Sequence, residues 1–337
     1  MVVTGAAGWF GRALVDRLAR SGDPAAPQIV AVVRGPDEAA SVRAVDPDAE
    51  IAVADVADPE AVRRVLPIGD STVDVVHAAG VIHPRRAAEF DAVNDRGTAN
   101  VVAAARRAGV RRFVHVSSNS PFGTNPSPRD TFGEHEPYHP YLGYGRSKMA
   151  AELHVLDAVE AGLDAVIVRP TWFYGPWQPA RQTAFFAMVR AGRFPVFGDG
   201  GQRRSMVYVD NLVDGVLAAE QAAGATGRAY WIADAEPYRM NEIVAAVRGA
   251  LTEHGLACRD AVLRLPPVVG AVAERADRAI QRLGGYQQQV HVLGELRHTI
   301  AVDIGAARRD LGYEPSVALD DGMRRSVRWC LDQGFEL

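Results

Sequence analysis

The first 170 residues alternate between short, continuous runs of apolar residues and longer Ala-rich segments with apolar residues at helical spacing. Continuous apolar runs are typical of strands buried on both faces of a parallel sheet, and the helical period indicates the crossovers between them. The runs predict six strands, at residues 1–4, 29–34, 50–54, 73–78, 112–117 and 165–169. Helices are predicted at 11–21, 59–66, 90–108 and 144–161. The pattern predicts an α/β fold with a Rossmann-type, doubly wound parallel sheet.

After Pro170 the pattern changes to aromatic, Pro- and Gly-rich segments between shorter amphipathic ones. Helices are predicted at 183–191 and 241–254, and a longer amphipathic stretch runs over 268–283. We therefore expect a smaller C-terminal substrate-binding lobe that lies over the sheet. The expected division is a nucleotide-binding domain of residues 1–171 and 205–222, and a lobe of residues 172–204 and 223–337.

Composition narrows the classes of partner. The formal net charge of −4 and a pI near 6.2 give no basic field for a polyphosphate backbone, so no nucleic acid partner is expected. Cys258 and Cys330 are distant in sequence and lack metal-ligand spacing, which predicts reduced thiols, no metal site and a cytoplasmic protein. No uncharged apolar run of about 18 residues is present, so no membrane association is expected.

A glycine-rich segment joins the first strand to the first helix and reads Thr4-Gly5-Ala6-Ala7-Gly8-Trp9-Phe10-Gly11. Glycines at this spacing permit a tight turn and close backbone approach, and the helix start presents unpaired N–H groups to a pyrophosphate. We expect cofactor contacts from Gly5, Ala7, Gly8, Trp9, Phe10 and Gly11. The strand before Thr4 has only three residues, shorter than the usual five or six, so the native chain is expected to begin upstream of Met1.

The end of the second strand indicates which nicotinamide cofactor is bound. NAD-binding folds usually place an acidic residue there for the ribose 2′-hydroxyl, but this strand ends in Arg34. A guanidinium at that point can hold a 2′-phosphate, which favours NADP, with NAD as the alternative. The competing interpretation is a solvent-facing arginine in an arginine-rich protein.

The single lysine of the chain supplies the strongest chemical signal. Lys148 is the only lysine among 37 lysine and arginine residues, which indicates a site where a compact ammonium is needed. Tyr144 precedes it by four residues, so both side chains lie on one face of a helix. A nearby ammonium favours ionisation of a phenol, and the pair therefore predicts a tyrosine that transfers a proton.

Four features in chain order resemble the extended short-chain dehydrogenase/reductase superfamily, also called the NAD-dependent epimerase/dehydratase family. They are the glycine loop, Ser118 after the fifth strand, the Tyr144–Lys148 pair, and Arg169-Pro170 after the sixth strand. The resemblance implies that Ser118 binds the substrate oxygen while Tyr144 transfers the proton and Lys148 assists. It also implies a homodimer formed through the helices that flank the catalytic one. Further cofactor contacts are implied for Asp55, Val56, Ala78, Ala79, Gly80, Asn94, Ser117, Tyr144, Lys148, Pro170 and Thr171.

The substrate side resembles the 3β-hydroxysteroid and sterol dehydrogenase branch more closely than the sugar-nucleotide enzymes. Trp172 stands where those enzymes carry an asparagine that contacts the sugar nucleotide, which favours a more apolar pocket. The segments 207–212 and 311–315 also resemble this branch, whereas Arg204 resembles an arginine that grips a diphosphate. The residues expected to bind the small-molecule substrate are Ser118, Ser120, Trp172, Phe173, Trp177 and Arg204.

The expected function is NAD(P)-dependent hydride transfer between nicotinamide and an alcohol or ketone carbon of a largely apolar, steroid-like or polyketide-like substrate. One alternative is a nucleotide-sugar 4-epimerase or dehydratase that holds NAD tightly and returns the hydride. Another is a non-catalytic, dinucleotide-binding regulator on the same fold, since a fold alone does not determine function.

Overall fold

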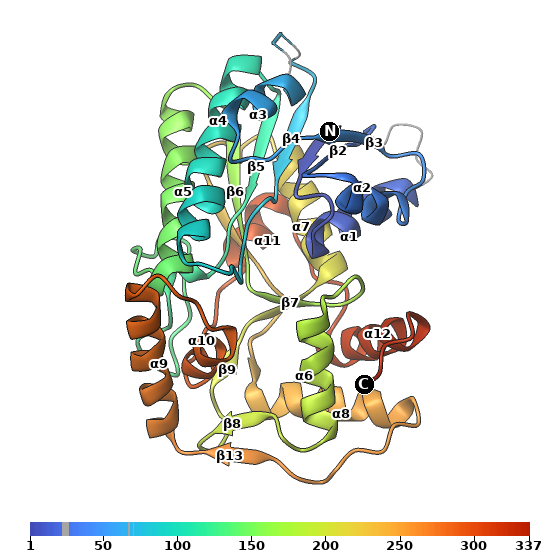
Figure 1. Ribbon diagram of the computed structural model, residues 1–337, viewed down its shortest axis with the longest axis vertical. Coiled ribbons are helices and arrows are strands. Elements are labelled where there is room, and N and C mark those ends of the chain that lie inside the picture. Colours follow the sequence, from blue (N-terminus) through green and yellow to red (C-terminus); the bar gives the residue numbers. More distant parts are fainter. Residues whose placement is uncertain (22–26, 67, 70) are drawn as a thin grey trace.

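A parallel sheet of seven strands forms the centre of the computed structural model, which describes residues 1–21, 27–66, 68–69 and 71–337 (Figure 1). The strands lie in the order β11-β6-β5-β4-β1-β2-β3, and every neighbouring pair is parallel. Their bounds are β1 Val2–Thr4, β2 Val30–Val33, β3 Glu50–Val53, β4 Asp74–His77, β5 Arg112–Val116, β6 Ala165–Pro170 and β11 Ala229–Ile232. The expected doubly wound sheet is thus confirmed.

Helices cover both faces of this sheet, as the crossovers of a parallel sheet require. On one face α3 and α5 both pack against α4, and on the other α1 and α11 both pack against α7 (Figure 1). The helices bounded here are α1 Trp9–Ala19, α2 Pro36–Arg43, α3 Pro59–Val65, α4 Gly97–Ala108, α5 Leu142–Glu160, α7 Val209–Gln221 and α11 Gly305–Leu311. Two short elements adjoin them, the π-helix η1 Phe90–Arg96 and the 3₁₀-helix η2 Ser120–Phe122.

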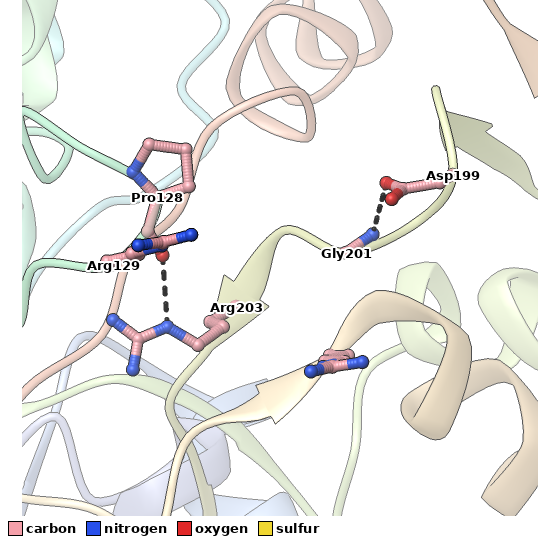
Figure 2. A pocket seen from close by; sticks show the side chains of 6 residues that line it. Pro128, Arg129, Asp199, Gly201 and Arg203 are labelled. Carbon is pink, nitrogen blue, oxygen red and sulfur yellow. Dashed lines mark hydrogen bonds between the residues drawn. The ribbon is translucent and has the colours of Figure 1, made fainter.

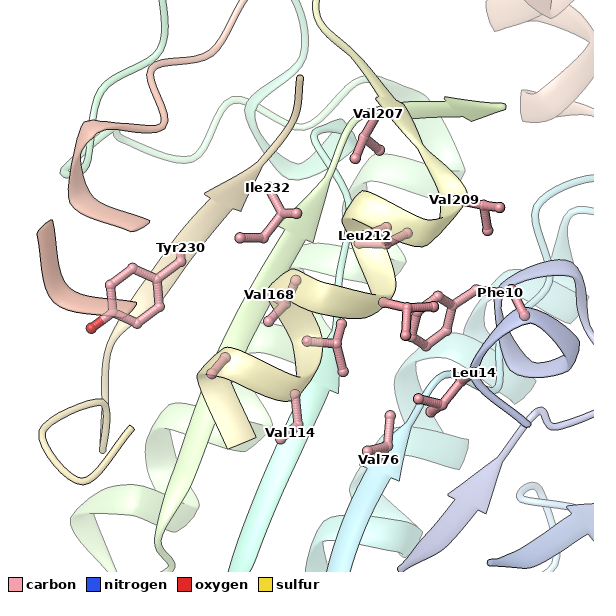
Figure 3. Close-up of a cluster of buried hydrophobic side chains, with 14 of the residues drawn as sticks. Phe10, Leu14, Val76, Val114, Val168, Val207, Val209, Leu212, Tyr230 and Ile232 are labelled. Atoms are coloured by element: carbon pink, nitrogen blue, oxygen red, sulfur yellow. The ribbon is translucent and has the colours of Figure 1, made fainter. Parts of the chain in front are cut away.

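Apolar side chains fill the space between the sheet and each layer of helices. Figure 3 shows Phe10 and Leu14 of α1 near Leu212 of α7, with Val76 and Val114 on the facing strands. All five side chains are at most 5% exposed. A second buried cluster fills the opposite face, between the strands and α3, α4 and α5. The two clusters hold the carboxyl ends of the strands in fixed positions.

The smaller lobe follows directly from the end of β6. It holds three short strand pairs, β7 with β10, β9 with β12, and β8 with β13. Its strands are β7 Trp172–Tyr174, β8 Pro195–Phe197, β9 Arg203–Arg204, β10 Met206–Tyr208, β12 Tyr238–Arg239 and β13 Leu263–Leu265. Its helices are α6 Ala180–Arg190, α8 Met240–Glu253, α9 Pro267–Arg282, α10 Gln288–Glu295 and α12 Leu319–Asp332. This lobe has its own apolar core, centred on Phe186, Val247 and Met323.

The structure differs from the sequence expectations in several places, among them helix α2, for which no helix was predicted. The helix expected over 90–108 begins as the π-helix η1 before it continues as α4. The strand β11 joins the central sheet beside β6, although residues 223–337 were expected to belong to the smaller lobe. None of the helices in the described part of the chain is long and apolar enough to span a membrane.

Candidate active site at the carboxyl edge of the sheet

The glycine loop makes a tight turn between β1 and α1. Gly5 has φ +72°, and a Cβ there would lie 2.7 Å from the backbone nitrogen of Ala79. A Cβ on Gly11 would lie 2.3 Å from the Gly5 carbonyl oxygen, so α1 packs directly on the turn. Arg12 N–H donates to the Gly8 carbonyl, which leaves the preceding N–H groups at the helix start outside the helical pattern. These groups fit a bound pyrophosphate.

The crevice for a dinucleotide lies where the strand order reverses, between β1 and β4. The turn after β4 passes close to β1, because Ala78 N–H donates to the Thr4 carbonyl and Ala79 N–H to the Thr4 hydroxyl. Across the site, Thr171 follows β6 and is 5% exposed, and its Oγ1 has no hydrogen-bond partner in the described part of the chain. An orphaned buried hydroxyl at this edge fits a bound cofactor amide.

Three other residues expected at the cofactor, Arg34, Asp55 and Val56, lie just after strands β2 and β3. Arg34 extends into solvent at the end of β2, with a side chain 71% exposed, and its guanidinium pairs with Glu38 at 2.5 Å. Asp55 follows β3 and accepts from the N–H of Ala57. Val56 is buried, and its carbonyl accepts from the amide of Asn100. Arg34 therefore has an acidic partner that the sequence analysis did not anticipate.

The side chains of two residues expected at the cofactor form hydrogen bonds with other residues of the protein. Asn94 is fully buried in η1, accepts from the N–H of Val81, and donates to the Val81 carbonyl and to Ser147 Oγ. Ser117 donates to the carboxylate of Glu152 at 2.5 Å. Asn94 thus ties the segment after β4 to the helix that carries Tyr144.

The three expected catalytic residues are brought together by β5 and α5. Ser118 lies two residues beyond the end of β5, is 9% exposed, and hydrogen-bonds the hydroxyl of Ser120 at 3.2 Å. Burial raises the pKa of Tyr144 to about 12, against opposing effects of a hydrogen bond with Ser118 and the charge of Arg181. Tyr144 is therefore protonated at neutral pH and positioned beside the serine.

Lys148 lies one turn further along α5 and faces the end of β5. Its ammonium donates to the Val116 carbonyl at 2.9 Å and lies 3.4 Å from Nε2 of His115. Burial lowers the pKa of Lys148 to about 8, and the charge of Glu152 opposes this shift. The pKa of His115 is far below its ordinary value, through burial first and the Lys148 charge second, so the imidazole is neutral and accepts from the lysine.

A buried ion pair between Arg169 and Glu152 stabilises this arrangement. Arg169 donates to both carboxylate oxygens of Glu152, at 2.7 and 3.1 Å for the shorter bond to each oxygen. Tyr138 also donates to Glu152, at 2.8 Å. Because Glu152 is on α5, Arg169 is on β6 and Ser117 follows β5, the network joins β6 to the two elements that position the catalytic residues.

The residues expected to bind substrate do not all lie together. Trp172 donates to the side chain of Gln182 and packs on Phe185. Phe173 packs on Trp9 of the glycine loop, with ring centroids 4.5 Å apart. Trp177 contacts Trp329 of α12, and its carbonyl accepts from Arg12 of α1 at 2.9 Å. The lobe therefore meets the glycine loop at Phe173 and the first turn of α1 at Trp177.

Arg204 is 5% exposed and does not extend freely into a pocket. It donates to the side chain of Glu295 at 3.2 Å and to the Glu295 carbonyl at 2.6 Å. Its neighbour Arg203 borders a shallow cavity of about 440 Å³ and donates to the carbonyl of Pro128 (Figure 2). That cavity is lined by Pro128, Arg129, Asp199, Gly201, Arg203 and Arg239, none of which was expected at the active site.

Sequence reasoning missed four polar residues around Tyr144 and Lys148. His115 had a usable signal, because a histidine within a buried apolar strand needs a partner. His83, Arg181 and Tyr286 had none, since they come from three separate segments that meet only in the folded chain. His83 Nδ1 lies 2.7 Å from the Tyr286 hydroxyl. The charge of Arg181 affects the pKa of both Tyr144 and Tyr286.

Comparisons with known proteins agree with this geometry. A model described as "NAD dependent epimerase/dehydratase family" matches residues 1–233. The uncharacterized protein y4nL of Sinorhizobium fredii is 44% identical over 99% of this chain and 96% of its own. A 2-alkyl-3-oxoalkanoate reductase of Stenotrophomonas maltophilia is 30% identical over 96% of this chain and 97% of its own. The crystal structure of DesIV, a dTDP-glucose 4,6-dehydratase from Streptomyces venezuelae with NAD and TYD bound, is 25% identical and superposes with a TM-score of 0.77, covering 99% of this chain and 98% of the other.

Proposed function

Because this chain belongs to the NAD-dependent epimerase/dehydratase family and is an enzyme, we propose that it reduces a ketone of a largely apolar substrate with NADPH, or oxidises the matching alcohol. The observation that carries the proposal is that Ser118, Tyr144 and Lys148 lie at the carboxyl edge of the sheet, the same edge at which the glycine loop follows β1. Gly5, Gly11 and the buried hydroxyl of Thr171 fit a bound dinucleotide.

The residues of this chain divide the reaction between them. When bound, the reduced nicotinamide supplies the hydride that reaches the carbonyl carbon. Ser118 holds the carbonyl oxygen by a hydrogen bond, and Tyr144 donates its phenolic proton to that oxygen as the alcohol forms. The raised pKa of Tyr144 keeps this proton in place at neutral pH. The Lys148 ammonium supplies positive charge near the phenolate that remains.

Two observations support an apolar ketone over a sugar nucleotide. The indole of Trp172 packs on Phe185, and it replaces a polar anchor with an apolar wall. Arg204 is already paired with Glu295, so its charge is not available to a diphosphate. The similarity to a 2-alkyl-3-oxoalkanoate reductase supports the same substrate chemistry.

For the cofactor, the position of Arg34 supports NADP. Its ion pair with Glu38 is exposed, and such pairs stabilise a protein by only about 0–1 kcal/mol. A 2′-phosphate offers a stronger, bidentate partner to the same guanidinium. We expect Arg34 to exchange Glu38 for the phosphate when NADP binds. We also expect a cytoplasmic protein that forms a homodimer, and light scattering of the purified protein measures the oligomeric state.

The proposed function is tested by following the absorbance of added NADPH and NADH against a panel of apolar ketones and nucleotide sugars. Net oxidation of added NADPH by ketones is expected. The similarity to DesIV supports the alternative, a nucleotide-sugar epimerase or dehydratase. It predicts conversion of a nucleotide sugar by cofactor that copurifies, with no net use of added NADPH, and that result would contradict the proposal.

A further inference from the structure

The imidazole of His115 contacts the ammonium of Lys148 inside the protein. Nε2 of the ring lies 3.4 Å from Nζ, and the carbonyl of the next residue, Val116, accepts from the same ammonium at 2.9 Å. His115 is 0% exposed and Lys148 is 4% exposed. An ammonium carries three N–H donors, so β5 holds two of them and one remains for a bound ligand.

The protonation states of His115 and its neighbour His77 follow from their contacts. Because Nε2 of His115 accepts from the ammonium, its ring proton lies on Nδ1, and the ring of His77 stacks on it with centroids 5.4 Å apart. Thr98 donates its hydroxyl proton to the Asn94 carbonyl at 2.6 Å, so its oxygen accepts from Nε2 of His77. Nδ1 of His77 then accepts from the Thr4 hydroxyl at 2.7 Å. Burial lowers the pKa of both imidazoles well below the ordinary value, so both are neutral at physiological pH.

The charge of Lys148 is not cancelled at this contact. In the described part of the chain no ion pair engages its ammonium, and both of its acceptors are neutral. The other titratable groups that act on it are the neutral His77 of β4 and the carboxylate of Glu152 on α5, which is paired with Arg169. A carboxylate at the position of His115 would also hold the ammonium, but it would neutralise the charge. A neutral imidazole holds the ammonium and leaves the charge available.

Packing of the strand does not explain a histidine at this position. Its neighbours Phe113, Val114 and Val116 on β5 are apolar, and Nδ1 of His115 is buried without a hydrogen-bond partner among the described residues. A buried N–H without an acceptor destabilises a fold, whereas an apolar side chain at the same place leaves no such group. The contact of Nε2 with Lys148 is the feature that an apolar residue could not supply.

We infer that His115 is a positioning residue for Lys148, whose ammonium Nε2 fixes at the end of β5 without cancelling its positive charge. The contact does not depend on the proposed function. The purpose of the charge does rest on it, since the charge stabilises the phenolate that Tyr144 leaves when it donates its proton. Without the imidazole acceptor, the ammonium loses a partner that favours its charged form. Lys148 should then release its proton at lower pH.

The experiment measures the titration of Lys148 directly, because it is the only lysine in the chain. Protein from cells supplied with lysine that is isotope-labelled at Cε gives a single lysine NMR signal, whose chemical shift is followed over about pH 5 to 10. His115→Phe keeps an aromatic ring but turns its electropositive edge to the ammonium, and His115→Val replaces the ring by a residue typical of buried strands. Both variants remove the acceptor, whereas His115→Gln keeps one.

Val114→Ala is the matched control, because it changes a fully buried residue of the same strand and leaves both acceptors of the ammonium in place. Thermal unfolding and NADPH binding report whether each variant is folded, and His115→Val carries the test if His115→Phe does not fold. The pH dependence of kcat/KM for NADPH oxidation by a ketone is measured in parallel.

The wild-type midpoint is expected near pH 8, since burial lowers the pKa of Lys148 to about 8. His115→Phe and His115→Val should lower this midpoint by about one pH unit, and His115→Gln should recover most of the shift. The alkaline limb of kcat/KM should move with the midpoint. Val114→Ala should lower stability and keep the wild-type midpoint.

A midpoint that both acceptor-free variants leave unchanged would overturn the positioning role, whether or not the enzyme reduces ketones. An equal shift in Val114→Ala would also overturn it, because disturbance of the core rather than loss of the acceptor would then explain the titration. A shifted midpoint in an enzyme that reduces no ketone would support the positioning role and overturn the proposed function.

Discussion

At the scale of single residues, the cofactor preference depends on a competition for Arg34. Glu38 accepts from the backbone N–H and from two side-chain nitrogens of Arg34, so it both positions and neutralises the guanidinium. Arg34→Gln should lower the ratio of kcat/KM for NADPH over NADH about tenfold or more, because the 2′-phosphate loses its charged partner. Glu38→Gln should raise the same ratio, since it frees Arg34. Steady-state kinetics with both cofactors measure the ratio, and a wild-type ratio in both variants would contradict the assignment.

A second prediction concerns the effect of Lys148 on how the free energy of unfolding depends on pH. Its pKa is lowered from 10.5 to about 8 by burial, so between these values the unfolded chain binds more protons than the folded one. The free energy of unfolding therefore gains a contribution that grows as pH rises from 8 towards 10.5, and burial of the ammonium carries its full cost below pH 8. Urea unfolding of the protein without cofactor, at pH 8 and pH 10, measures this contribution.

Lys148→Met is the matched variant, because it keeps the length of the side chain and removes the titrating group. The difference in unfolding free energy between wild type and variant should shift by about 2 kcal/mol in favour of the wild type from pH 8 to pH 10. No shift would mean that the buried lysine titrates normally, and a shift in the opposite direction would mean that folding raises its pKa.

The sequence was most informative about chemistry at the level of single residues. A single lysine four residues after Tyr144 identified the pair, and the structure directs its ammonium at the end of β5. The effects that shift the pKa of Tyr144 differ from the expected effect of the Lys148 ammonium. Among the causes of its pKa shift are Ser118 and Arg181, and the Arg181 contribution arises from a contact between distant segments that no local pattern contains.

At the scale of elements, the glycine loop is held by contacts between backbone atoms. Gly11→Ala would place a Cβ 2.3 Å from the Gly5 carbonyl oxygen, so α1 must move away from the turn. The expected result is weaker binding of NADPH by about tenfold or more, since the helix start no longer meets the pyrophosphate. Fluorescence titration with NADPH measures this affinity.

Gly249→Ala is the control for the effect of a methyl group on a helix. Gly249 lies in α8, and a Cβ there meets no atom within 4 Å. This variant should bind NADPH like the wild type and be more stable by up to about 1 kcal/mol, because alanine favours a helix. If Gly11→Ala also binds NADPH normally, the loop is not the cofactor site.

The elements themselves were largely predictable, for a physical reason. Strands buried on both faces are continuous apolar runs, and each of the six expected strands agrees with the structure to within one residue at either end. The π-helix η1 was not predicted, because its apolar spacing resembles that of an ordinary helix. Asn94 lies within η1, and its side chain bonds both Val81 and Ser147.

At the scale of the whole molecule, the site depends on how the two parts of the chain meet. Ser118 and Tyr144 come from the sheet edge and the helix beside it, whereas Arg181 and Tyr286 come from the smaller lobe. The sequence predicted the first pair through motifs. It did not predict the second pair, because Arg181 and Tyr286 lie far from Tyr144 in sequence, and the packing of Tyr286 on Phe90 depends on tertiary contacts alone.

Tertiary packing also explains why some residues expected to bind substrate do not lie together. Arg204 and Trp177 matched local patterns, but a local pattern does not say which neighbour reaches a side chain first. Glu295 of α10 reaches Arg204, whereas Trp177 contacts both Trp329 of α12 and Arg12 of α1. Whether either residue also contacts substrate stays a prediction.

Single-turnover kinetics of Tyr144→Phe test whether Tyr144 transfers the proton during hydride transfer. The enzyme with bound NADPH is mixed with a ketone that the wild type reduces, and the loss of reduced-cofactor absorbance is followed. Tyr141→Phe is the matched control, because the Tyr141 hydroxyl is buried without a hydrogen-bond partner in the described part of the chain. The expected rate is about 100- to 10,000-fold lower for Tyr144→Phe, with unchanged NADPH affinity, and nearly normal for Tyr141→Phe. Reduction by Tyr144→Phe at the wild-type rate would contradict the assigned role of Tyr144.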